Sequence, residues 1–155
     1  MFIFGLKCGN IKISMKILIV CTGNSCRSQM AQGFLQSMDK SLVVFSAGTE
    51  PSQQVNSHAV FVMQEIGIDI SHQVPEDVLR YKNDPWDWVI TVCDDADKKC
   101  PVFEGEVKNR LHIGLEDPFL ARGSDEFVKN EYRRIRDEIV EAFGKLYREK
   151  LKKNY

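Results

Sequence analysis

Short apolar runs alternate along the chain with longer polar or amphipathic stretches. Continuous runs of β-branched and aliphatic residues suit strands that are buried on both faces of a parallel sheet. The apolar runs predict four strands, over residues 16–20, 42–45, 88–92 and 111–113. The first run, Lys16-Ile17-Leu18-Ile19-Val20, is the most continuous and predicts a central strand.

The stretches between these runs carry helix signals. Asn56 or Ser57 can cap one helix, which Gly67 ends, and Pro101 must end a short helix that Cys93 opens. Further helices are predicted over residues 29–35, 76–81 and, with an apolar stripe, from about Ser124 to about Lys150. Strands that alternate with helices predict one α/β domain of three layers, a four-stranded parallel sheet flanked by helices.

Composition narrows the class of protein. The 155 residues fit a single domain, and 43% hydrophobic with 28% charged residues argues against disorder. A net charge of -1 gives no broad basic surface for nucleic acid, and no apolar run approaches the roughly 20 residues that span a membrane. Residues 1–14 lack the pattern of a signal peptide, so we expect an N-terminal extension before a domain over residues 15–155. We expect a cytoplasmic monomer.

The cysteines point to chemistry in a reducing compartment. The chain has five of them, Cys8, Cys21, Cys26, Cys93 and Cys100. An odd number without an export signal is not typical of a secreted disulfide scaffold. Each cysteine taken alone can still be an ordinary buried thiol. The three histidines form no metal-ligand spacing with the cysteines, so no metal centre is predicted from them.

The loop between the first strand and the first helix is the strongest functional signal. Its sequence is Cys21-Thr22-Gly23-Asn24-Ser25-Cys26-Arg27-Ser28. Backbone N–H groups at such a turn converge, and the helix dipole adds positive potential, so the loop can bind a tetrahedral oxyanion. Gly23 and Asn24 are predicted to supply unusual backbone angles, and Arg27 to bind two anion oxygens.

The same loop predicts that Cys21 is a nucleophile. A helix N-terminus and a nearby cation lower the pKa of a cysteine thiol. A thiolate that faces a bound oxyanion stands in position for attack. Ser28 can donate a hydrogen bond to the Cys21 sulfur.

The string from Cys21 through Gln29-Met30-Ala31 resembles the phosphate-binding loop of the low-molecular-weight protein tyrosine phosphatase superfamily. It is most similar to the thioredoxin-coupled arsenate reductases, since the phosphatase branch usually has proline where this chain has Gln29. The resemblance extends from about Lys16 to about Ala142. It implies arsenate as substrate, phosphate or sulfate as analogues, and thioredoxin as external reductant, with no tightly bound cofactor.

The resemblance also implies a general acid. An aspartate before proline protonates the leaving oxygen in this superfamily, and Asp117-Pro118 matches it. Taken alone, the pair is a common turn signal. Phosphatases of the group often continue with tyrosines, whereas Phe119-Leu120-Ala121 follows here, which favours the reductase.

Cys93 and Cys100 are seven residues apart, two helical turns. Their Cα atoms would be about 10.5 Å apart on a helix, whereas a disulfide needs roughly 4.4–6.8 Å. The two can therefore bond only if the helix unwinds. The segment between them is short and polar, and such a helix is marginal on its own. The alternative is two unrelated buried thiols.

The resemblance implies a relay among three cysteines. Cys21 attacks arsenic while Asp117 assists the loss of water. Cys93 attacks Cys21 and arsenite leaves, and Cys100 then attacks Cys93. Thioredoxin reduces the resulting Cys93–Cys100 disulfide.

Some relatives bind potassium behind the loop, which implies a weak site at Asn24, Ser46 and Glu76. This chain has Gln32 where that group usually has glutamate, and a hard cation favours carboxylates. Cys26 is predicted to be a small filler of the loop. Two other functions stay open: a phosphatase acting on phosphotyrosine, and a non-catalytic oxyanion-binding module.

Overall fold

The computed structural model describes residues 14–152. Residues 1–13 of the predicted extension, with Cys8, lie outside the described residues. The strands are β1 (Lys16–Cys21), β2 (Val43–Gly48), β3 (Trp86–Thr91) and β4 (Val107–His112). The α-helices are α1 (Arg27–Met38), α2 (Ser57–Gln64), α3 (Asp94–Lys99) and α4 (Asp125–Leu146). Shorter helices are η1 (Val78–Tyr81), η2 (Pro118–Leu120) and the π-helix η3 (Tyr147–Leu151).

The four strands form one parallel sheet in the order β2-β1-β3-β4. The central strand β1 is buried from Ile17 to Cys21, as its continuous apolar run predicts. In the register of β1 with β2, Cys21 lies beside Gly48. The carboxyl ends of the strands therefore meet at one edge, where the loop that starts at Cys21 begins.

The strands extend beyond the predicted limits where their sequence is polar. β4 starts at Val107, not Leu111, and its Lys108, Asn109 and Arg110 are exposed. It pairs only with β3, and an edge strand with solvent on one side needs no apolar run. β2 likewise continues through Ser46 to Gly48, because backbone pairing with β1 holds residues that the hydrophobic pattern leaves out.

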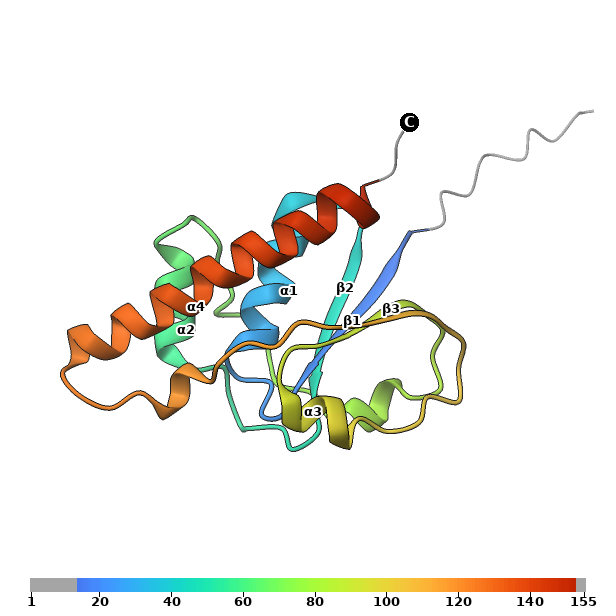
Figure 1. The fold of residues 1–155 in the computed structure, drawn as a ribbon, viewed down its shortest axis with the longest axis horizontal. Coiled ribbons are helices and arrows are strands. Elements are labelled where there is room, and N and C mark those ends of the chain that lie inside the picture. The colour runs from blue at the N-terminus through green and yellow to red at the C-terminus, as the bar shows by residue number, and fades with distance from the viewer. Residues whose placement is uncertain (1–13, 153–155) are drawn as a thin grey trace, which may run out of the picture.

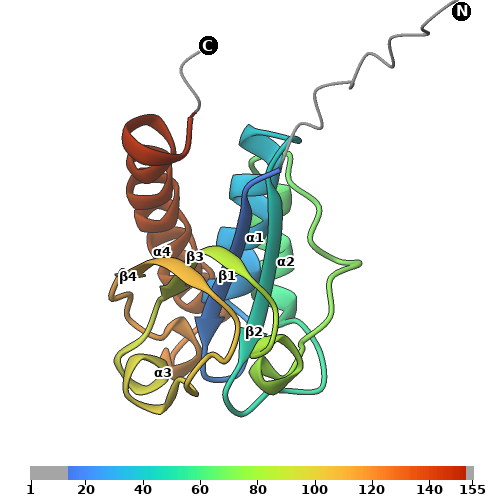
Figure 2. The ribbon, with the colours of Figure 1, turned by 90° about the vertical axis from the view of Figure 1, so that its right-hand side faces the viewer.

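Helices cover both faces of the sheet. α4 packs against α1 and α2 on one side of the strands, while α3 and η1 lie on the other (Figure 1, Figure 2). α1 begins at Arg27, two residues before the predicted start, because the Cys26 carbonyl already accepts from Met30 N at 2.9 Å. The three-layer α/β arrangement predicted from the sequence is confirmed.

Side-chain caps mark the starts of α2 and α4. Asn56 Oδ1 accepts from His58 N at 2.8 Å at the start of α2, and Gly67 takes a φ of 80° shortly after its end. Ser124 Oγ accepts from Phe127 N at 3.1 Å at the start of α4. The predicted single helix from Ser124 to Lys150 is instead α4 followed by the π-helix η3.

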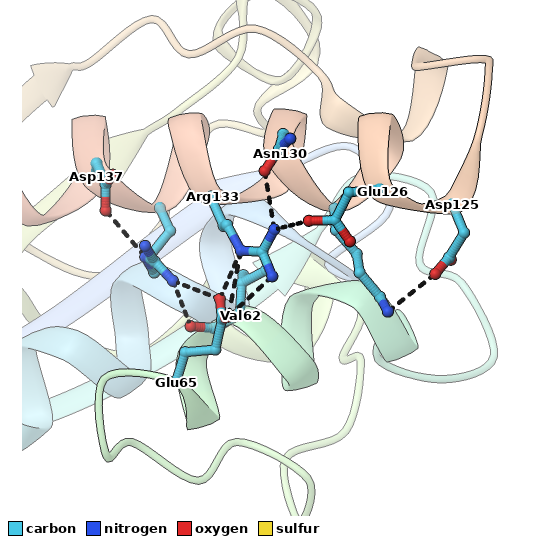
Figure 3. A network of polar contacts seen from close by, with 9 residues as sticks. Val62, Glu65, Asp125, Glu126, Asn130, Arg133 and Asp137 are labelled. Atoms are coloured by element: carbon cyan, nitrogen blue, oxygen red, sulfur yellow. Dashed lines mark hydrogen bonds and ion pairs between the residues drawn. The ribbon is translucent and has the colours of Figure 1, made fainter.

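An ionic network joins α4 to α2 (Figure 3). Arg133 binds Glu65 at 3.0 Å and Glu126 at 2.8 Å, and Arg136 binds Glu65 at 2.9 Å. Each pair at a surface contributes little, but the shared Glu65 ties two turns of α4 to the end of α2. Within residues 14–152, no helix combines the length and apolar character needed to cross a membrane.

Candidate active site

The loop from Cys21 to Cys26 lies where β1 and β2 end. Thr49 N donates to Cys21 O at 3.1 Å, Glu50 N to Thr22 O at 2.9 Å and Ser52 N to Gly23 O at 2.8 Å. A Cβ atom at Gly48 would stand 2.5 Å from Thr22 O, so only glycine lets the end of β2 approach the loop this closely. The loop is therefore held to the sheet by backbone contacts along its length.

Asn24 organises the interior of the loop. It is fully buried, and its φ of 50° is the only positive φ at a non-glycine residue between residues 14 and 152. Gly23 does not share this conformation; a side chain there would instead meet Ser52 Oγ, 2.9 Å from an added Cβ. The prediction of unusual backbone angles is thus confirmed at Asn24 and wrong at Gly23.

A directed chain of hydrogen bonds leads from Asn24 to the sulfur of Cys21. Asn24 Nδ2 donates to Ser28 Oγ at 2.8 Å, which leaves the Ser28 hydrogen for Cys21 Sγ, also 2.8 Å away. Asn24 N donates to Cys21 Sγ at 3.1 Å. The sulfur therefore accepts from two donors, and the predicted Ser28 contact is confirmed.

The environment of Cys21 contains opposing effects on its pKa. Burial raises the pKa of the thiol, while Ser28, Arg27 and the Asn24 N–H oppose that rise. The net direction is upward, so the low pKa predicted from the helix N-terminus is wrong for this geometry. The reason is desolvation, because Cys21 is only 2% exposed.

Arg27 and Asp117 meet at the mouth of the site. Arg27 Nη1 donates to Leu115 O at 3.0 Å, and Nη2 lies 3.5 Å from Asp117 Oδ2. Asp117 Oδ1 accepts from Phe119 N at 3.0 Å, which makes it the N-cap of η2. Asp117 thus both caps the turn at η2 and lies at the site beside Arg27.

A cavity of about 760 Å³ opens in front of the loop. It is lined by loop residues, by the start of α3 and by the segment before η2: Cys21, Thr22, Gly23, Asn24, Ser25, Cys26, Arg27, Glu50, Ser52, Cys93, Asp94, Asp95, Gly114, Leu115, Glu116, Asp117 and Phe119. Every residue predicted to bind oxyanion lines it except Ser28, which lies behind the Cys21 sulfur with no exposed surface. The cavity brings together the predicted nucleophile Cys21, the predicted acid Asp117, the Arg27 cation and two further thiols, those of Cys26 and Cys93.

The two remaining predicted cysteines flank α3. Cys93 is its N-cap, with Sγ accepting from Ala96 N at 3.4 Å and lying 3.4 Å from Thr22 Oγ1. Cys100 is the C-cap and lines a separate cavity of about 310 Å³. Cys93 therefore shares the cavity of Cys21, whereas Cys100 does not. Burial raises the pKa of Cys100, and Arg110 lowers it in part.

Two residues at the site, Asp95 and Gln29, make contacts that the sequence did not predict. Asp95 Oδ2 accepts from Thr22 Oγ1 at 3.0 Å and lies 3.1 Å, through Oδ1, from Lys99. Gln29 is fully buried, and its Nε2 donates to Asn24 O and Oδ1 at 3.0 and 3.1 Å. Asp95 could have been found from its place two residues after Cys93, in the first turn of α3, while a buried glutamine after the loop carries no comparable signal.

Cys26 lies between the loop and α4. Its Sγ is 3.7 Å from the hydroxyl of Tyr132, whose ring stacks on His58 with 5.2 Å between ring centroids. Burial raises the pKa of Cys26 to about 11. These contacts agree with the predicted packing role.

The residues expected to hold potassium do not fit a cation as they are arranged. Asn24 Oδ1 accepts from Glu76 N at 2.9 Å, and Ser46 Oγ accepts from Asn24 Nδ2 at 2.9 Å and donates to Gln32 Oε1 at 2.6 Å. The Glu76 carboxylate turns to Arg80 at 2.8 Å. The oxygens of the expected site are thus bound to N–H and O–H donors, with the amide of Gln32 in place of a charge.

The sequence matches the family described as low molecular weight phosphotyrosine protein phosphatase over residues 16–155. Among curated proteins, an arsenate reductase of Bacillus subtilis (strain 168) is 44% identical over 128 residues, covering 79% of this chain and 88% of that protein.

Solved structures of two kinds share the fold. An arsenate reductase in the phosphate binding state has a TM-score of 0.62 at 31% identity, covering 84% of this chain and 98% of its own. A low molecular weight protein tyrosine phosphatase from T. tengcongensis has a TM-score of 0.73 at 26% identity, covering 87% and 99%. The fold is therefore shared with both arsenate reductases and tyrosine phosphatases, and only the side chains can distinguish the two activities.

Proposed function

The chain belongs to the low molecular weight phosphotyrosine protein phosphatase family, and within it we propose that the protein is an enzyme that reduces arsenate to arsenite. Cys21 is the nucleophile, Cys93 and Cys100 form the disulfide relay, and thioredoxin is the reductant. The resemblance to the B. subtilis arsenate reductase supports the reaction.

One observation carries the choice of reductase over phosphatase: Cys93 lines the cavity of Cys21 and is joined to Cys100 by a six-residue helix. A phosphatase needs the nucleophile, the arginine and the acid, but no further thiols. Two cysteines that cap the two ends of one short helix beside the nucleophile are poorly explained as packing residues.

The first step forms a sulfur–arsenic bond. The Cys21 thiolate attacks arsenate, which is held by the loop N–H groups and by Arg27. One oxygen leaves as water with a proton from Asp117, and arsenic stays in its oxidised state. The Ser28 hydroxyl and the Asn24 N–H stabilise the thiolate before attack.

The second step transfers two electrons. The Cys93 thiolate attacks the Cys21 sulfur, so that a sulfur–sulfur bond forms and the sulfur–arsenic bond breaks, with its electron pair passing to arsenic. Arsenite is released. Cys100 then attacks Cys93 and frees the Cys21 thiolate, and the Cys93–Cys100 disulfide holds the oxidising equivalents.

Closing the cycle requires a dithiol donor. Thioredoxin attacks the Cys93–Cys100 disulfide, becomes oxidised itself and returns both cysteines to thiols. Such a donor operates in a compartment that keeps thiols reduced, which is why we propose a cytoplasmic location.

The test follows NADPH oxidation by the protein with thioredoxin and thioredoxin reductase, with and without arsenate. Cys93→Ser and Cys100→Ser are compared with the parent, and Cys8→Ser, outside the motif, is the matched control. We expect arsenate-dependent turnover in the parent and the control and none in the two relay variants.

A parent that oxidises no NADPH with arsenate, yet hydrolyses an aryl phosphate as fast as both relay variants do, would be a phosphatase. Binding of phosphate without turnover in either assay would make it an oxyanion-binding module.

A further inference from the structure

Helix α3 is held to the end of β4 by a polar network centred on His112. Its carboxylates Asp94 and Asp97 both face His112, the last residue of β4. His112 Nε2 lies 3.0 Å from Asp94 Oδ1, and Nδ1 lies 3.7 Å from Asp97 Oδ1. Thr91, at the end of β3, completes the network.

The donors in this network determine the state of the imidazole. Thr91 Oγ1 donates to Asp97 Oδ1 at 2.8 Å, so toward His112 Nδ1, also at 2.8 Å, it can only accept. His112 Nδ1 must therefore carry a hydrogen. Nε2 faces a carboxylate oxygen, which also can only accept. Both contacts are satisfied together only when both ring nitrogens are protonated, because a neutral imidazole has one N–H.

Four titratable or charged groups surround the ring. They are Asp94 and Asp97 from α3, Cys100 at its end, and Arg110 from β4. The two carboxylates are the groups within ion-pair distance of the ring. Histidine changes charge between about pH 5 and pH 8, within the range in which cells work.

We propose that His112 is a positioning residue for the relay: as a cation it holds α3 closed through Asp94 and Asp97, and its deprotonation eases the opening that a Cys93–Cys100 disulfide requires. The inference rests on the proposed function, because it gives α3 a reason to open. It adds a regulatory element whose centre, His112, does not line the Cys21 cavity, although its partner Asp94 does.

The size of the effect follows from the exposure of the groups. The side chains of His112, Asp97 and Asp94 are 33%, 53% and 85% exposed. Pairs of this kind change such an opening equilibrium by about 1.4- to fivefold, which is the equivalent of about 0.2–1 kcal/mol.

The first test measures hydrogen exchange of the α3 amides in the reduced, full-length protein between about pH 5.5 and pH 8. His112→Gln is compared with the parent at each pH, and His72→Gln, which changes an exposed histidine in the loop after α2, is the control. We expect the parent amides to be about 1.4- to fivefold better protected than those of His112→Gln at the lower pH, with the difference vanishing at the higher pH. The control should match the parent throughout.

The second test measures formation of the Cys93–Cys100 disulfide in a Cys21→Ser background. Diamide supplies the oxidant: its azo bond takes up two electrons and two protons as the two thiols form one disulfide. We expect His112→Gln to form the bond faster than the parent at low pH and at the same rate at high pH. If the histidine variant folds poorly, Asp94→Asn, an exposed change on α3 itself, replaces it. We expect Asp94→Asn also to form the disulfide faster than the parent at low pH and at the same rate at high pH.

Equal protection in parent and variant at every pH, or a constant ratio between them, would overturn the inference. Neither test uses arsenate or thioredoxin. A protein that reduces arsenate but shows no effect of His112 on α3 would refute the positioning role of His112 alone. A protein that lacks arsenate turnover but shows the pH-dependent protection would refute the proposed function alone.

Discussion

Arg27 and Asp117 face each other across the mouth of the cavity, with Arg27 Nη2 3.5 Å from Asp117 Oδ2. Arg27 opens α1 and Asp117 caps η2, so the contact links the oxyanion loop to the segment that follows β4. Arg27 also donates to Leu115 O at 3.0 Å in that segment. The Arg27 guanidinium therefore holds the loop, the segment around Leu115 and the Asp117 carboxylate together.

Asp117→Asn should lower kcat for arsenate, and for any aryl phosphate turned over, by about 10²–10⁴-fold. Asparagine keeps the oxygen that accepts from Phe119 N, so η2 stays capped, but it has no proton to give. Steady-state kinetics with Glu116→Gln as the neighbouring control measure the effect. An unchanged kcat would remove Asp117 from the role of acid.

Arg27→Lys should weaken phosphate binding by at least about tenfold, because lysine cannot bind two anion oxygens in one plane and loses a charge-assisted hydrogen bond. It also loses the contact with Leu115 O. Isothermal titration with inorganic phosphate at fixed ionic strength measures the dissociation constant. Equal affinities would mean that the loop N–H groups alone hold the anion.

Ser28→Ala should raise the pKa of Cys21 further, since Ser28 is the largest of the contributions that lower it. Loss of a hydrogen bond to a charged sulfur corresponds to about one pKa unit or more. The rate of alkylation by iodoacetamide, followed against pH in a Cys26→Ala, Cys93→Ser, Cys100→Ser background, should move to higher pH. A profile that does not move would show that the Asn24 N–H is sufficient.

Cys26→Ala should make the protein less sensitive to alkali. In the folded protein the pKa of Cys26 rises from 9.0 to about 11, so the folded state holds this proton more tightly than the unfolded state does. The resulting stability is present below pH 9.0 and is lost as the pH rises toward about 11. Between about pH 8.5 and pH 10.5 the free energy of unfolding should fall by about 2 kcal/mol more in the parent than in the variant. Urea denaturation at the two pH values provides the comparison, and parallel falls would contradict it.

Potassium should stabilise the protein no better than sodium at equal ionic strength. The Asn24 and Ser46 oxygens already accept hydrogen bonds, and Gln32 offers no charge. Thermal unfolding in the two chlorides measures this. A melting temperature that rises in potassium alone would mean that the network reorganises around the ion.

The fold and the centre of the site could be predicted because their signals are local. A continuous apolar run identifies β1, and the loop after it contains its own nucleophile and cation within seven residues. β4 was predicted too short because its hydrogen bonds with β3 hold polar residues that no hydrophobic pattern marks.

The pKa of Cys21 was predicted in the wrong direction for a related reason. The sequence reveals the helix N-terminus and Arg27, but not how completely the sulfur is removed from water. The contacts of Gln29 and Asp95 could not be predicted because their partners, Asn24 and Thr22, are set by the folded loop, in which Asn24 takes a left-handed conformation.

The sulfur of Cys93 is also the N-cap of α3, where it accepts from Ala96 N. In the proposed cycle, the atom that takes part in each disulfide is thus the atom that fixes the first turn of the helix. In that cycle a Cys93–Cys100 disulfide requires α3 to unwind, which breaks this cap, so the oxidised enzyme differs from the reduced one in shape as well as in oxidation state. A reductant can then recognise the oxidised enzyme by its shape, and need not bind the reduced enzyme, which has no disulfide to reduce.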